Sequence, residues 1–274
     1  MGGLYCFGLV ASDVSLPPEP LPALPDDPPP VLIGSDVCQV IASRTTRTSV
    51  PQRRRYMRAH TRLLEVVGAH ATVLPMRFGT IADDEPALRE AIRPEAARIA
   101  RLLETMEGQR AYGLSVRLTR ERLVGRAMAA RPDLRRERDR LSRQPGVTRA
   151  TAMTFGRHVG DAVATERRRL EKAILAGLRP AVDDLVLRAP ESDEQVLRAE
   201  IRLDRSREPS LDDVIQEIAR QIGGDAAPVA PASGPADEGA TADAPPAIRL
   251  VGPAPLYAFV DLRLSLVNQR TPVT

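Results

Sequence analysis

The sequence predicts an α+β protein that folds as two domains, and three observations lead to this prediction. The chain has 274 residues, which corresponds to two domains of roughly 100–200 residues each. Apolar residues make up 43% and charged residues 27% of it, as in a globular protein that can bury a core. Short apolar segments with strand patterning alternate along the chain with longer segments that have helical spacing.

The first predicted element is a buried strand. Residues 4–10 (LYCFGLV) are apolar on both alternating faces, as expected for a strand in the middle of a sheet. Eight of the fourteen residues at 17–30 are proline, so this stretch should form an extended loop with few backbone donors. The segments 31–34 and 37–42 flank Gly-Ser-Asp and indicate a hairpin.

A helix over residues 53–68 should lie on this sheet, because its apolar residues recur at steps of three and four. The next strand is predicted over residues 72–80 (TVLPMRFGT). It should begin near Pro75 or pair on only one side there, since proline has no N–H to donate. The alternation places on one face Leu74, Met76 and Phe78. We expect that face to share the core with the helix residues Tyr56, Leu63 and Val67.

A second helix should begin after the acidic run at residues 83–85, because carboxylates followed by a first-turn proline are a helix-start signal. Helical spacing of apolar residues continues to residue 107, with a kink expected at Pro94, where the helix loses a backbone donor. These helices would cover the first sheet and complete an N-terminal mixed α+β sheet domain at residues 1–109.

The second domain is predicted at residues 110–274 from the order of its elements. Strand, helix, helix, strand, strand, helix and strand are indicated at residues 111–118, 119–143, 148–178, 184–188, 196–204, 210–222 and from 248. This βαββαβ order is typical of a ferredoxin-like domain, with a four-stranded antiparallel sheet and helices on one face. Residues 224–246 are rich in Ala and Pro, so they predict a disordered insertion whose deletion should leave the fold intact.

Charge and cysteine content indicate the cellular compartment and the class of partner. The net charge is only +3, although seven arginines and no acid lie between residues 44 and 62. Arginine stripes can bind phosphates, but aromatic interleaving for base stacking is absent, so the sequence argues against a nucleic-acid partner. Two cysteines without ligand spacing, no signal peptide and no membrane-length apolar run favour a cytoplasmic protein that does not span a membrane.

The sequence contains no familiar motif for catalysis or cofactor binding. GxGxxG, the Walker loop, GxSxG and HExxH are missing, and each of the three histidines stands alone in its segment. His60 lies on the apolar face of the helix at residues 53–68, where we interpret it as a core histidine bonded to the backbone. Two of the three Asp-Asp pairs are explained by helix starts. We therefore predict a protein without enzyme activity, metal or cofactor.

Three segments together resemble the gas vesicle protein F/L family. They are residues 4–10, residues 58–80 (RAHTRLLEVVGAHATVLPMRFGT) and residues 251–260 (VGPAPLYAFV), in the family's order and at comparable separations. Residues 107–117 differ in lacking a Trp that is often found there, and residues 224–246 look like an insertion. The resemblance implies an accessory or minor protein of the gas vesicle, a gas-filled protein shell made in the cytoplasm. Its partners would be the small, very apolar shell subunit and other gas vesicle accessory proteins.

The apolar, proline-containing strands in two of these segments predict a partner-binding region. Strands at a sheet margin can leave an edge open to a partner strand. The predicted contact residues are Pro75, Arg77, Pro253, Pro255 and Tyr257. We expect the Arg77 side chain also to make a structural hydrogen-bonded pair or to bind backbone carbonyls at the strand end, since its five donors suit a clamp.

Two other classes of function stay open on the sequence alone. A regulatory or RNA-binding ferredoxin-like protein would bind nucleic acid with an affinity that falls strongly with salt. A small-molecule enzyme would need a deep pocket with convergent polar groups around His60 or Arg77.

Overall fold

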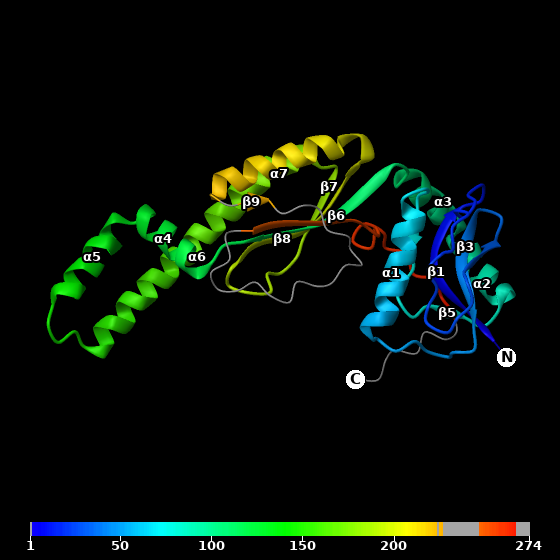
Figure 1. Ribbon diagram of the computed structural model, residues 1–274, viewed down its shortest axis with the longest axis horizontal. Coiled ribbons are helices and arrows are strands. Elements are labelled where there is room, and N and C mark those ends of the chain that lie inside the picture. The colour runs from blue at the N-terminus through cyan, green and yellow to red at the C-terminus, as the bar shows by residue number, and fades with distance from the viewer. Residues whose placement is uncertain (1, 224, 227–246, 267–274) are drawn as a thin grey trace. The chain divides into compact units, whose positions relative to one another are not determined.

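The computed structural model describes residues 2–223, 225–226 and 247–266 and confirms a mixed α+β protein with two sheets (Figure 1). Contacts divide the chain into two compact units. Unit 1 contains residues up to 112 together with 251–266, and unit 2 contains residues 113–223, 225–226 and 247–250.

The sheet of unit 1 is built around the first strand of the chain. Its strand order is β2-β3-β1-β4, and β5 also pairs with β1. The strands are β1 (Gly3–Ala11), β2 (Val31–Gly34), β3 (Cys38–Thr45), β4 (Leu74–Pro75) and β5 (Ile81–Ala82). The strand predicted at residues 4–10 and the hairpin that follows it are thereby confirmed.

Helices cover both faces of this sheet. One face carries α1 (Arg54–Gly68), and the other carries α2 (Glu85–Ile92) and α3 (Ala96–Thr105) (Figure 1). The kink predicted at Pro94 is a short 3₁₀ segment (Arg93–Glu95) between α2 and α3. The start of α2 also agrees with the sequence, because the Asp84 carboxylate accepts a hydrogen bond of 2.8 Å from the Ala87 N–H.

Alternate residues of β1 supply two separate hydrophobic clusters. Leu4, Cys6 and Leu9 pack with α2 and α3, whereas Tyr5, Phe7 and Val10 pack with α1. A bulge between Cys6 and Gly8 shifts the alternation by one residue. Every side chain of β1 from Leu4 to Val10 is therefore buried, which explains why this segment is apolar on both of its faces.

The strand predicted over residues 72–80 is much shorter than expected. In residues 72–82 only the two-residue strands β4 and β5 pair with β1. A turn separates them, in which the Thr80 N–H donates to the Arg77 carbonyl at 3.2 Å. Gly79, with φ of +88°, supplies the left-handed backbone that this turn requires.

The prediction that Leu74, Met76 and Phe78 share one face is wrong for the same reason. Leu74 and Met76 are buried in the cluster with α2 and α3. Phe78 lies beyond the regular alternation and packs, half-buried, against the α1 cluster that includes Tyr56, Leu63 and Val67.

The second sheet has the strand order β7-β8-β6-β10-β9. Its strands are β6 (Gln109–Arg117), β7 (Asp184–Leu187), β8 (Gln195–Asp204), β9 (Asp225–Ala226) and β10 (Ala247–Ala254). Between them come the helices α4 (Arg120–Ala130), α5 (Pro132–Arg143), α6 (Arg149–Leu178) and α7 (Glu208–Ile222). The predicted sheet of four antiparallel strands needs correction, because β9 adds a fifth strand that runs parallel to β10.

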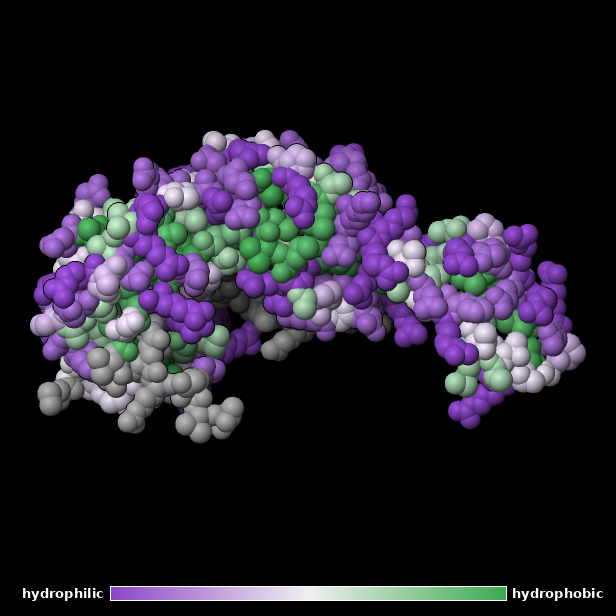
Figure 2. All heavy atoms as spheres, turned by 180° about the vertical axis from the view of Figure 1, so that it is seen from behind, coloured by the Kyte–Doolittle hydropathy of each residue, from purple (hydrophilic) through white to green (hydrophobic). Residues whose placement is uncertain are grey.

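The helices α4 and α5 pack on the first half of α6 around a small core of Ala127, Met128, Leu134 and Ala162. Pro132 ends α4 and begins α5, which divides the single helical segment predicted at residues 119–143. The outer surface of α4 and α5 is mostly hydrophilic (Figure 2).

Of two predictions about the second half of the chain, one concerns residues outside the described ranges and the other needs correction. The insertion predicted at residues 224–246 lies outside the described residues, apart from the short strand β9. Residues 251–266, predicted to belong to the second domain, group instead with unit 1. They do so because Leu256, Leu264 and Leu266 are buried in its core, a long-range contact without a local sequence signal.

We predict that Leu74→Ala lowers the free energy of unfolding by about 2–5 kcal/mol, because it leaves a cavity in a fully buried site. Val31→Ala is the matched control, since Val31 on the edge strand β2 is 51% exposed. Its effect should stay below about 1 kcal/mol. Urea unfolding of both variants provides the comparison, and equal losses would contradict the assigned core.

Candidate partner-binding site

A closed circuit of hydrogen bonds joins four segments of unit 1. The Tyr5 hydroxyl on β1 lies 2.7 Å from His60 Nδ1 on α1. His60 Nε2 lies 2.6 Å from the Tyr257 hydroxyl. That hydroxyl donates to the Met76 carbonyl at 3.2 Å, and the Gly79 N–H donates to the Tyr5 hydroxyl at 3.3 Å. The circuit thus begins and ends in the turn after β4.

The protons of the circuit can be assigned from the backbone groups at its two ends, because the Met76 carbonyl can only accept and the Gly79 N–H can only donate. The single proton of the Tyr257 hydroxyl goes to Met76, so this hydroxyl must accept from His60 Nε2–H. A neutral imidazole then has only an acceptor at Nδ1, to which the Tyr5 hydroxyl donates. The Tyr5 oxygen in turn accepts from Gly79. All bonds run in one direction, an arrangement in which each bond polarises the next.

Burial keeps the groups of the circuit neutral. His60 is only 1% exposed, and this desolvation lowers its pKa to about 4. The same cause raises the pKa of Tyr5 and that of Tyr257 far above the usual tyrosine range. The Phe7 ring stacks on the imidazole at a centroid distance of 5.4 Å, and Phe78 meets it edge-on at 5.7 Å. His60 is therefore a core histidine, as interpreted from the sequence. Tyrosine hydroxyls lie at both of its ring nitrogens, and an interaction with the Met76 backbone opposes part of the lowering of its pKa.

The circuit presents the Tyr257 ring at the surface. The residue is 41% exposed, although its hydroxyl is held from two sides. Of the other predicted contact residues, Arg77 and Pro253 are exposed and Pro255 is half-buried. Pro75 is buried in β4, opposite Gly8 of β1, and has no accessible surface to offer a partner.

The structural pair predicted for Arg77 is not found. Within the described part of the chain, its guanidinium makes no hydrogen bond or ion pair, and only its carbonyl is used, as an acceptor for Thr80. The Arg77 side chain is exposed in the turn at residues 77–80.

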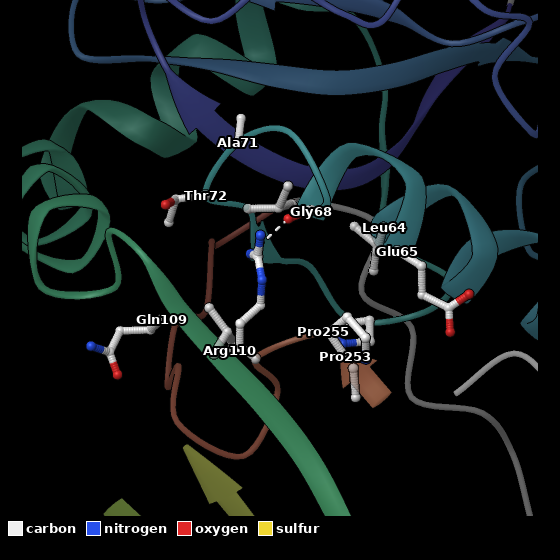
Figure 3. A pocket seen from close by; sticks show the side chains of 12 residues that line it. Leu64, Glu65, Gly68, Ala71, Thr72, Gln109, Arg110, Pro253 and Pro255 are labelled. Carbon is white, nitrogen blue, oxygen red and sulfur yellow. Dashed lines mark hydrogen bonds between the residues drawn. The ribbon is translucent and has the colours of Figure 1, made fainter. Parts of the chain in front are cut away.

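Pro253 and Pro255 line a small cleft beside the end of α1 (Figure 3). Arg110 crosses it and donates to the Gly68 carbonyl at 2.8 Å, which satisfies an acceptor at the helix C-terminus. The cleft encloses only about 40 Å³, and a hollow beside Arg77 about 20 Å³. Pockets for small-molecule substrates usually measure about 300–1,000 Å³, so these hollows have room for a side chain but not for a substrate.

Two members of the circuit were missed by the sequence analysis. Tyr5 carries the only side-chain hydroxyl in an otherwise apolar buried strand, and that polar group could have signalled a buried partner. Gly79 takes part through its backbone, which no sequence pattern reveals. The contact of His60 with Tyr257 spans 197 positions.

Among the described residues, no cluster of three or more His, Cys, Asp or Glu side chains is placed to hold a metal ion. None of their helices combines the length and apolar character that a membrane span requires.

We predict that the free energy of unfolding falls as the pH drops from about 6.5 to about 4. Above pH 6.5 His60 is neutral in both states, whereas between these values the unfolded chain binds a proton that the folded protein excludes. The loss should approach about 3.5 kcal/mol, at about 1.4 kcal/mol per pKa unit, and should stop below pH 4. The His60→Gln variant should be less stable at neutral pH, but its free energy of unfolding should lack this additional fall between pH 6.5 and pH 4. The same slope in both proteins would contradict the assignment.

Comparisons with known proteins agree with this architecture. The family model Gas vesicle synthesis protein GvpL/GvpF matches residues 3–261. Gas vesicle protein F from Streptomyces sp. (strain CB03234) is 27% identical over 172 residues, which is 62% of this chain and 71% of that protein.

Two crystal structures of GvpF share the fold. That from Anabaena sp. PCC7120 has a TM-score of 0.71 at 16% identity and covers 96% of this chain and 98% of its own. That from Microcystis aeruginosa has a TM-score of 0.62 at 20% identity, with coverage of 80% and 90%. Because the family model spans nearly the whole chain, the protein belongs to the GvpL/GvpF family of gas vesicle synthesis proteins.

Proposed function

We propose that this protein acts in gas vesicle assembly as a non-enzymatic accessory protein. It would bind shell subunits in a chaperone-like or minor structural role, in the cytoplasm and at the gas vesicle, together with other accessory proteins. Membership of the family supports the gas vesicle role. The observation that supports binding most directly is the Tyr257 ring, which is exposed at the surface while its hydroxyl is fixed from inside.

A fixed aromatic ring is well suited to protein binding. Tyrosine is enriched among the residues that dominate interface energies, because it buries a large area with few rotatable bonds. Here the two hydrogen bonds to Tyr257 restrict the ring before binding, so less entropy is lost on association. Pro253 and Pro255 precede it and lack N–H groups that would need partners, while exposed Arg77 adds a charge nearby.

The chaperone-like role follows from the chemistry of the client. Small, very apolar shell subunits would associate with one another through exposed apolar surface before they are assembled. A partner that covers part of that surface prevents this association and keeps the subunit available for assembly. An apolar ring with adjoining prolines can make such a contact without a catalytic group, which fits a role that requires no turnover.

Part of the proposal concerns the domains. We retain a boundary near residue 109 and a ferredoxin-like second domain. Support comes from the βαββαβ order and from the strand arrangement β7-β8-β6-β10, in which the two outer strands are the second and fourth of the domain. Ferredoxin-like sheets that bind RNA stack bases on aromatic residues. On β8 the half-buried face carries instead Arg198, Glu200 and Arg202, in ion pairs such as Arg198 with Glu191 at 2.8 Å.

We predict that Tyr257→Ala reduces recovery of the shell subunit in a pull-down after co-expression by about tenfold, the usual loss for a central aromatic contact. Leu187→Ala is the matched control, since Leu187 is 44% exposed on the edge strand β7. Tyr257→Phe separates the ring from its hydroxyl, because it keeps the apolar area and loses both hydrogen bonds. It should give an intermediate loss. Binding should persist in moderate salt.

The same variants should be tested for vesicle formation in cells that lack the native gene. Loss of vesicles with Tyr257→Ala but not with Leu187→Ala is the expected result, provided that both variants have native thermal unfolding. Normal vesicles in the deletion strain, with a purified protein that retains RNA and never the shell subunit, would overturn the proposal.

A further inference from the structure

The strand β7 forms one edge of the second sheet. In the described part of the chain it pairs with β8 on one side only. The Arg188 N–H, one residue beyond β7, donates to the Arg198 carbonyl at 2.9 Å. Because the backbone groups of a strand point alternately to its two sides, those of Leu185 and Leu187 point away from β8. In agreement, the Leu185 N–H donates to the carboxylate of its neighbour Asp184 at 2.8 Å.

The centre of this edge lacks the usual devices that block strand pairing. Those devices are prolines, bulges and charged side chains. Residues 185–187 contain no proline or charge, no bulge interrupts their pairing with β8, and Leu187 is 44% exposed. In the first sheet, by contrast, Arg89 donates to the Gly34 carbonyl on the edge strand β2 at 3.0 Å. β7 therefore presents an edge that another strand can join.

The sequence of this edge is complementary to itself. Residues 184–188 are Asp-Leu-Val-Leu-Arg. When two copies pair in antiparallel with Val186 on the two-fold axis, each Asp184 lies opposite the Arg188 of the other copy, and each Leu185 opposite its Leu187. The outward backbone groups of the leucines then face each other and can exchange hydrogen bonds. A shift by one residue would lose these bonds, and a shift by two would lose both charge pairs.

The charged ends of this segment have contacts within the chain that leave atoms for a second copy. Asp184 Oδ2 lies 3.7 Å from Arg202, and Arg188 Nε lies 3.7 Å from Glu200. Asp184 Oδ1 accepts from Leu185. In the paired edges this N–H would instead donate to the Leu187 carbonyl of the second copy. The released Oδ1 can then accept from the terminal nitrogens of the second copy's arginine.

We infer that the β7 edge pairs with the β7 edge of a second copy of this chain. The two sheets then continue as one across a two-fold axis, held by backbone bonds, leucine pairs and two ion pairs. Since each copy contributes one short strand, the buried area is small and the dimer should form in a concentration-dependent manner. Because β7 belongs to unit 2 and Tyr257 to unit 1, this inference does not rest on the proposed shell-subunit site.

Charge reversal tests the register by sedimentation equilibrium of the full-length protein, which should show a concentration-dependent dimer. Asp184→Arg and Arg188→Asp each place like charges opposite each other at both ends of the paired edges. Each variant alone should therefore dimerise about tenfold or more weakly. An equimolar mixture of the two should recover the dimer, because arginines of one variant then face aspartates of the other. Arg136→Asp, an exposed control on α5, should dimerise like the native protein.

Cysteine cross-linking gives a second measurement that does not depend on these charges. Both native cysteines are buried, so an introduced surface thiol can be followed by itself. Across the proposed axis the Cα atoms at position 186 would lie about 4.5 Å apart, which a disulfide can span. Val186→Cys should therefore form covalent dimers under mild oxidation. Val31→Cys, at an exposed position of the edge strand β2, should not.

Four outcomes would each overturn the inference. They are a native protein that stays monomeric up to about 1 mM, a mixture of the reversed variants without recovery, an equal loss in the Arg136→Asp control, and equal cross-linking at positions 31 and 186. Thermal unfolding verifies that the variants are folded. Where a charge-reversed variant is not, the cross-linking comparison decides alone.

Discussion

A neutral imidazole with only one proton determines how unit 1 is held together. His60 can donate from one nitrogen and must accept at the other, and both positions face tyrosine hydroxyls while the imidazole itself is buried. This requirement orients Tyr5 and Tyr257 and connects both to the turn at residues 76–79. Losing any member would leave a buried donor or acceptor unpaired, which usually costs about 1–3 kcal/mol. One residue on α1 thereby fixes a strand, a turn and a segment almost 200 positions away.

A bulge in β1 decides which face its later residues reach. Tyr5 and Phe7 lie under α1 by ordinary alternation, and the shift after Cys6 places Leu9 in the opposite cluster and Val10 under α1. The absence of a side chain at Gly8 allows the backbone of β4 to approach, since a Cβ there would lie 2.9 Å from the Leu74 carbonyl oxygen. β4 then leads directly into Met76 and the turn that closes the circuit. Local backbone geometry and the buried polar circuit depend on each other.

The sequence predicted those features whose signals are local. The buried strand, the hairpin, α1 and the start of α2 each have a pattern within about fifteen residues, and all four agree with the structure. The strand prediction for residues 72–80 was wrong because the strand-like alternation of the sequence continues into residues 77–80, where Gly79 allows the chain to turn. The exposed position of Arg77 follows from that turn. Neither the His60 to Tyr257 contact nor the packing of residues 251–266 in unit 1 has a local signal. Family resemblance could therefore name segments of the candidate site, but the sequence could not predict how they are arranged.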